Sequence, residues 1–151
     1  MKLTLTEDIT PEEIVFLYKD NYSRFWNDSL KAVDQITVED IKTTTLYIGV
    51  KDRDKLIGVV ILVPRLNKVL EGHIILDSRI KNKGEQVINQ TIKYIQKKHS
   101  NFCAIMVDIP SYFPLVLKLI TKCGFMFVKR VSNAVSRNQV YFDVYTFLRC
   151  I

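Results

Sequence analysis

The feature that most constrains this sequence is a strand pattern that passes through a short basic stretch directly into an amphipathic helix. Residues 69–76 form the apolar strand pattern, and residues 77–84 form the basic stretch, which ends at a glycine. The segment that follows has one mostly apolar face at helical spacing, made of Val87, Ile88, Thr91, Ile92 and Ile95. A helix of this kind buries its apolar face against another element, so the junction predicts a layered domain that mixes strands and helices.

Strand and helix patterns on both sides of the junction extend this architecture along the chain. Thr10, Pro11 and Glu13 form the pattern of a capping box with proline at the first helical position. A weaker N-cap pattern at residues 37–40 predicts a short second helix. The predicted strands cover 2–6, 45–51, 55–63, 69–76, 102–109, 125–131 and 140–148. The predicted helices cover 11–25, about 37–40, a long segment that follows the basic stretch and ends near 97–99, and 115–122.

Length and composition favour one ordinary globular domain over residues 1–151. The chain has 151 residues, of which 48% are hydrophobic and 25% are charged. Its apolar runs, such as residues 57–63, are far shorter than the roughly 20 residues that a membrane-spanning helix needs. The N-terminus lacks the apolar core of a signal peptide, so a cytoplasmic location without membrane attachment is expected.

Charge and cysteine usage narrow the chemistry only in part. Lys and Arg number 22 against 16 Asp and Glu, and the formal net charge of +6 favours anions in general without choosing among them. The three cysteines, Cys103, Cys123 and Cys150, form no C-x-x-C pair, and with only 2 histidines no metal site is predicted. Reduced thiols are expected, and Cys103, which lies in an apolar run, is predicted to be buried.

The loop between the third long strand and the long helix is the candidate binding site. Backbone N–H groups and the helix dipole favour a phosphate at such a helix start. Arg79, Lys81 and Lys83 would add positive charge there. The alternative interpretation is an ordinary strand-to-helix connection with solvated basic side chains.

The order of elements and this loop resemble the GNAT acyltransferase superfamily, which binds acetyl-coenzyme A at a junction of the same type. The family loop reads Gln/Arg-x-x-Gly-x-Gly/Ala, and residues 79–84 are similar to it, with Asn82 in place of the first glycine. Asparagine tolerates left-handed backbone geometry better than most residues, so the replacement is acceptable. A second register, in which residues 81–84 match the family's Arg-Gly-Lys-Gly, stays open.

The C-terminal part of the chain also resembles this family. Val107-Asp108-Ile109-Pro110, followed by a helix and Lys122-Cys123-Gly124-Phe125, is similar to the family's fifth strand and Lys-x-Gly-Phe ending. The two final strand runs around Asn138 are similar to its last hairpin. The resemblance spans about residues 46–148. It implies an α/β (α+β) fold in which a mixed, mostly antiparallel sheet of about seven strands is flanked by four helices.

The resemblance further implies acetyl-CoA as the co-substrate and an amine or protein as the acceptor. Backbone N–H groups near Asn82 and Gly84 would hold the pyrophosphate, and the amides of Leu76 and its neighbours would hold the pantetheine arm. The cofactor-binding residues expected on this basis are Leu76, Arg79, Lys81, Asn82, Lys83, Gly84 and Glu85.

The candidate catalytic residues are Glu71, His73 and Tyr112. The family often uses a glutamate of the fourth strand as the base that accepts the proton of the amine, and Glu71 and His73 lie two residues apart on that strand. Ile120 stands where many members have a tyrosine acid, and Tyr112 is a nearby substitute. The alternative interpretation makes Glu71 an edge carboxylate, His73 a partly buried histidine and Tyr112 a surface aromatic.

Two other functional classes stay open at the level of sequence. The missing tyrosine and the degenerate glycine loop allow a catalytically inactive GNAT-like fold, such as a bacteriophage binding or assembly protein, found in the virion or the host cytoplasm. A nucleic-acid binder is the least favoured alternative, because exposed aromatics interleaved with basic residues are only weakly indicated. The acceptor and the oligomeric state, with a homo-oligomer among the options, are left undetermined.

Overall fold

The computed structural model describes residues 2–78, 80 and 82–151. They form one seven-stranded sheet of order β1-β2-β3-β4-β5-β7-β6, whose described neighbouring strands are antiparallel except for β4 and β5. This is the expected mixed, mostly antiparallel α/β (α+β) architecture. The strands are β1 (Leu3–Thr6), β2 (Leu46–Asp52), β3 (Lys55–Pro64), β4 (Val69–Leu76), β5 (Ala104–Pro110), β6 (Met126–Arg137) and β7 (Val140–Cys150). The described α-helices are α1 (Pro11–Phe25), α2 (Gly84–Lys98) and α3 (Pro114–Lys122).

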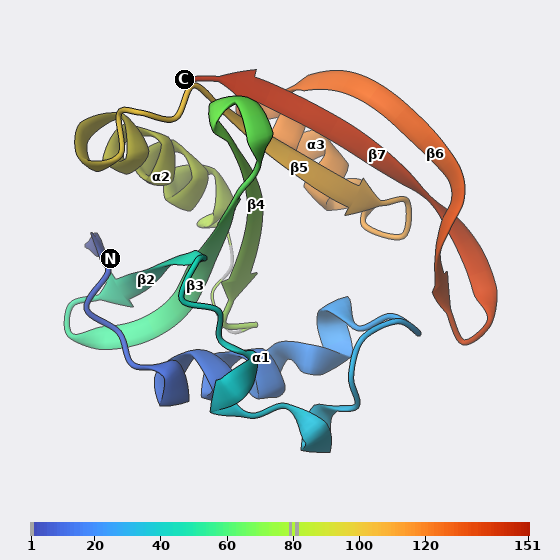
Figure 1. Ribbon diagram of the computed structural model, residues 1–151, viewed down its shortest axis with the longest axis horizontal. Coiled ribbons are helices and arrows are strands. Elements are labelled where there is room, and N and C mark those ends of the chain that lie inside the picture. Colours follow the sequence, from blue (N-terminus) through green and yellow to red (C-terminus); the bar gives the residue numbers. More distant parts are fainter. Residues whose placement is uncertain (1, 79, 81) are drawn as a thin grey trace.

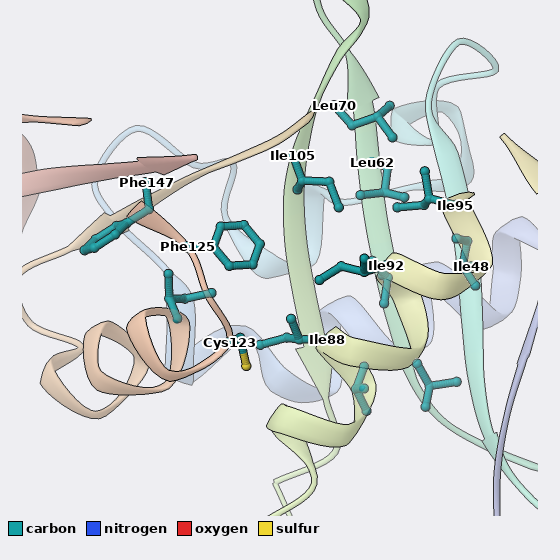
Figure 2. Close-up of a cluster of buried hydrophobic side chains, with 14 of the residues drawn as sticks. Ile48, Leu62, Leu70, Ile88, Ile92, Ile95, Ile105, Cys123, Phe125 and Phe147 are labelled. Atoms are coloured by element: carbon teal, nitrogen blue, oxygen red, sulfur yellow. The ribbon is translucent and has the colours of Figure 1, made fainter. Parts of the chain in front are cut away.

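The helices cover the two faces of the sheet in separate layers (Figure 1). Helices α2 and α3 contact each other and bury apolar side chains against one face, whereas α1 packs against the other face. On the α1 face, Ile14 and Leu17 meet Val59 and Ile75. The larger core on the α2 face, shown in Figure 2, includes Ile48, Leu62, Leu70, Ile88, Ile92, Ile95, Ile105, Phe125 and Phe147.

The sequence predicted the start of α1, the end of α3 and the buried face of α2. The Glu13 N–H donates to Thr10 Oγ1 at 3.1 Å, and the Thr10 N–H donates to Glu13 Oε2 at 2.8 Å, so the capping box before α1 is formed. Gly124 follows α3 with a φ of +83°, a left-handed conformation that suits glycine. The face predicted for α2 is buried, with exposed fractions of 0–6% for Val87, Ile88, Thr91, Ile92 and Ile95.

Two predicted elements differ from those observed. Residues Val38–Asp40 form a single 3-10 turn, so the described residues contain three α-helices where four were expected. Strand β6 runs to Arg137, well beyond its predicted end at Val131, because β6 and β7 continue as a long hairpin beyond the core. Most of β6 is exposed, and an exposed ribbon has no strict apolar alternation from which its length could be predicted.

The prediction that Cys103 is buried is wrong. Strand β5 begins only at Ala104, and Cys103 lies exposed just before it, where its N–H donates to the Lys68 carbonyl at 2.9 Å. Over the described ranges, no three or more His, Cys, Asp or Glu side chains are grouped as a metal site would require. None of the described helices is long and apolar enough to cross a membrane.

A polar contact joins the end of α2 to the loop after β1 and makes part of the stability depend on pH. His99 Nε2 lies 2.6 Å from Glu7 Oε1, and the Tyr94 hydroxyl donates to the same oxygen at 3.0 Å. Burial raises the pKa of Glu7, but the hydrogen bonds from His99 and Tyr94 outweigh it. The pKa of Glu7 therefore lies below its ordinary value of 4.5.

Replacing Glu7 by glutamine is expected to lower the melting temperature at pH 7 by about 2 °C, a shift of the size that a part-exposed ion pair supports. A carboxylate whose pKa is lowered on folding stabilises the fold above its unfolded pKa, and this contribution is lost as the pH falls below about 4.5. Thermal unfolding of both proteins at pH 7 and pH 3 checks this. A difference of equal size at both pH values would contradict it.

Candidate functional site

The sheet opens between its two parallel strands. Strands β4 and β5 pair only from Val69 to Glu71 against Ala104 to Met106. Beyond that point β5 stays with β7, while β4 stays with β3 as far as Leu76, and the two strands diverge (Figure 1). One edge of β4 therefore has no described strand partner from Gly72 to Leu76, and its peptide groups on that side are open to a ligand.

Gly72 lies where the strands separate. A Cβ at this position would lie 3.3 Å from Ile105 Cγ2 and 3.6 Å from Leu62 Cδ2, which is close to the limit of van der Waals contact. Because Gly72 has no side chain, Ile105 and Leu62 can pack closely at the point where β4 and β5 separate.

The open edge of β4 leads to the start of α2, as the candidate site requires. The N-cap residue Lys83 makes no side-chain capping bond, and the first helical backbone bond runs from the Val87 N–H to the Lys83 carbonyl at 2.9 Å. The N–H groups of Gly84, Glu85 and Gln86 therefore have no intrahelical acceptor. The Glu85 carboxylate is turned toward Lys122 at 2.8 Å and does not cap the helix itself.

The structure gives Asn82 the backbone that a glycine would have at this place. Its φ is +59°, in the left-handed region where asparagine is the best tolerated replacement for glycine. This agrees with the expectation drawn from the family loop. Arg79 and Lys81, which were predicted to assist in anion binding, lie outside the described residues, whereas Lys83 is described and half-buried.

Glu71 and His73 lie together on the α1 face of β4. His73 Nε2 is 3.1 Å from Glu71 Oε1, and Arg65 Nε donates to Glu71 Oε2 at 2.7 Å. The side chain of Glu71 is 16% exposed and that of His73 is 47% exposed. Burial raises the pKa of Glu71, but Arg65 and His73 outweigh this effect and hold it below 4.5. Glu71 is thus a paired carboxylate, and His73 is the accessible member of the dyad.

Tyr112 lies apart from this dyad, in the turn after β5. Its ring packs against Phe113 and Phe142, and the Arg137 guanidinium carbon lies 5.0 Å from the ring centre. Burial raises the pKa of the Tyr112 hydroxyl, and the Arg137 charge offsets this only in part. Among the described residues, no contact joins Tyr112 to Glu71 or His73.

The tip of the β6–β7 hairpin is fastened to the segment after α1. The Asn138 and Gln139 N–H groups donate to the Asp28 carboxylate at 3.0 and 2.9 Å. The Arg137 guanidinium carbon also lies 4.9 Å from the centre of the Trp26 ring, so the guanidinium is shared between two aromatic rings. We call these contacts of Trp26, Asp28 and residues 137–139 the hairpin clamp. Sequence analysis identified the turn at Asn138 but not its partner.

Replacing Asp28 by alanine is expected to release the hairpin clamp and to speed amide hydrogen exchange at Asn138 and Gln139 on the order of tenfold. The backbone bond from Gln139 is the largest of the causes that lower the pKa of Asp28 below 3.8. Acidification below about pH 3.8 should therefore weaken the clamp in the native protein. Asp28→Asn keeps an acceptor oxygen and serves as the matched control. Unchanged exchange in the alanine variant would contradict the assignment.

Comparison with known proteins was made at the level of sequence and of structure. No protein-family model and no curated protein matches the sequence. Solved structures do match. A mutant of the spermidine N-acetyltransferase SpeG from Vibrio cholerae has a TM-score of 0.81 at 21% identity, with 98% of this chain and 93% of that chain covered. The acetyltransferase of GNAT family from Streptococcus pneumoniae has a TM-score of 0.77 at 16% identity, with 99% and 100% covered.

This chain has the GNAT fold. The likeness runs over nearly the whole chain, so the N-terminal strand and α1 belong to the fold together with the segment that carried the sequence resemblance. The neighbours are acetyltransferases, and the alternative of a phage assembly protein gains no support from them.

Proposed function

We propose that this chain is an N-acetyltransferase that transfers an acetyl group from acetyl-CoA to an amine. The observation that carries the proposal is the open edge of β4, which leads to a helix start whose N-cap residue makes no side-chain capping bond, within a GNAT fold. An open strand edge suits the amides of a pantetheine arm, and N–H groups without an intrahelical acceptor suit a pyrophosphate. The residues present therefore fit acetyl-CoA.

The binding roles follow from this arrangement. The peptide groups from Gly72 to Leu76 would pair with the pantetheine arm. The backbone N–H groups of Gly84, Glu85 and Gln86 would hold the pyrophosphate, next to the left-handed Asn82. Lys83 would add charge, and Arg79 and Lys81 keep the supporting role that their place in the loop suggests.

We assign the proton transfer to His73 and the positioning of its ring to Glu71. Acetyl-CoA, when bound, supplies a thioester whose carbonyl carbon accepts the amine nitrogen as the carbon–sulfur bond breaks, and CoA leaves as a thiolate that takes up a proton from solvent. His73 Nδ1, the ring nitrogen that does not face Glu71, would accept the proton that the amine nitrogen loses. Glu71, held by Arg65, orients the imidazole. Tyr112 packs against Arg137 of the hairpin clamp, and we assign it no role in acid catalysis.

The acceptor is an amine whose class the fold does not define. The neighbours named spermidine N-acetyltransferase act on a polyamine, which makes small amines the first compounds to test. One of these neighbours is described as dodecameric, so the oligomeric state belongs in the same set of measurements.

Isothermal titration of the purified chain with acetyl-CoA tests the proposal directly. We expect saturable binding with a Kd on the order of micromolar. Absence of binding at millimolar acetyl-CoA would overturn the proposed function. Once binding is seen, thiol release in the presence of a panel of amines identifies the acceptor.

A further inference from the structure

Arg24, in the last turn of α1, reaches across to the end of β4. Its Nη1 donates to the Leu76 carbonyl at 2.7 Å and to Asn21 Oδ1 at 3.3 Å. Asn21 is only 2% exposed, and its Nδ2 donates to the Leu17 carbonyl at 2.9 Å. The guanidinium is therefore positioned by a buried amide, although Arg24 itself lies at the surface.

The Leu76 carbonyl that receives Arg24 belongs to the open edge of β4. The Asp77 N–H donates to the Ile57 carbonyl of β3 at 2.8 Å. The N–H and C=O of one trans peptide group point in opposite directions, so the Leu76 carbonyl points away from β3, toward the open side. Arg24 thus donates to an acceptor that the proposed pantetheine arm would also use.

Arg24 also brings a positive charge to the side of the site opposite α2. In the described part of the chain, its contacts at this edge are with a backbone carbonyl and an amide oxygen, and no carboxylate pairs with it. A guanidinium has five N–H donors in a planar fork, and a diphosphate is the kind of partner that this fork binds best. Leu76 is the last residue of β4 before the loop to α2, so this charge lies at the β4 end of the loop that leads to the proposed pyrophosphate site.

We propose that Arg24 donates a hydrogen bond to the Leu76 carbonyl in the free protein. When acetyl-CoA binds, a pantetheine amide donates to this carbonyl instead, and Arg24 then pairs with the diphosphate. This inference rests on the proposed function and adds a specificity residue to it. Arg24 opposes binding of the pantetheine arm, because the two compete for one acceptor. It favours ligands that carry the diphosphate, which compensates for the lost hydrogen bond. The protein would therefore discriminate acetyl-CoA from shorter thioesters.

The test compares acetyl-CoA with S-acetylpantetheine, which has the same amides and thioester but no phosphate. Binding can be followed by the fluorescence of Trp26, the only tryptophan, which lies two residues beyond Arg24. In Arg24→Gln we expect the affinity for acetyl-CoA to fall about tenfold, as for loss of a charge-assisted contact, and the affinity for S-acetylpantetheine to stay equal or rise. Arg24→Lys, which keeps the charge, should bind acetyl-CoA more tightly than Arg24→Gln.

Matched controls separate this inference from the alternatives. Lys19→Gln removes an exposed charge from the same helix and should change neither affinity. Equal losses for both ligands in Arg24→Gln would show a merely structural role and overturn the inference, and so would an unchanged affinity for acetyl-CoA. A native protein that binds neither ligand would instead overturn the proposed function. If Arg24→Gln does not fold, Arg24→Lys is compared with the native protein, because lysine keeps the charge but lacks the planar fork: equal affinities of the two proteins for acetyl-CoA overturn the inference.

Discussion

Replacing His73 by glutamine is expected to lower the rate of acetyl transfer by roughly two to four orders of magnitude, the range typical for loss of a general base. Glutamine keeps a polar side chain of similar length but cannot take up a proton at neutral pH. The geometry that supports this expectation is the 3.1 Å contact between His73 Nε2 and a Glu71 carboxylate that Arg65 also holds. The imidazole is exposed on the face where the strands open, so an incoming amine can reach it.

The pH profile distinguishes His73 from Glu71 as the base. A titrating base gives an ascending limb in the profile of kcat/KM against pH, and this limb should vanish in His73→Gln. Glu71→Gln should slow the reaction about tenfold through loss of positioning, yet keep an ascending limb. Loss of the limb in Glu71→Gln but not in His73→Gln would reverse the assignment.

His99→Gln is the matched control for His73, because the chain has only 2 histidines. His99 lies at the end of α2 against Glu7, away from the open edge of β4. The control should lose a little stability and keep its rate per folded molecule. A comparable loss of rate in both variants would show that the effect of His73→Gln is not specific to the site.

The elements of this fold could be predicted where burial imposes a period on the sequence. The apolar face of α2, from Val87 to Ile95, repeats every three to four residues because it packs against a sheet, and the structure buries that face. The length of β6 was underestimated because most of this strand is exposed. Without burial, no apolar repeat marks where the strand ends. Cys103 was placed in the core because it sits in an apolar run, although the strand starts one residue later.

The candidate site was predictable only where it is local in sequence. The pairing of Glu71 with His73 follows from the two-residue repeat of a strand, and the left-handed backbone at Asn82 follows from the chemistry of asparagine. Arg24 could not be found in the same way, because it bonds to a residue 52 positions away. The partner of Asp28 lies 110 positions away. Such contacts depend on how α1 is placed against the sheet, and no local pattern in the sequence encodes that placement.

Replacing Gly84 by glutamate is expected to weaken acetyl-CoA binding by at least about a hundredfold. Gly84 is the first residue of α2, and its N–H is one of the groups proposed to hold the pyrophosphate. A carboxylate at this place would repel the diphosphate and offer itself to the same N–H groups. The negative charge suits a helix start, so α2 itself should not be weakened by it.

Gly84→Ala separates charge from crowding in this test. A Cβ at Gly84 would lie 2.7 Å from Leu119 Cδ2, the far end of a flexible side chain that can turn aside. Both variants carry this Cβ, and only one carries the charge. We expect Gly84→Ala to bind acetyl-CoA within about fivefold of the native protein, because its backbone N–H groups remain uncapped. Titration of both variants with acetyl-CoA, together with their melting temperatures, completes the comparison. Equal affinities in two folded variants would mean that the diphosphate does not bind at the start of α2.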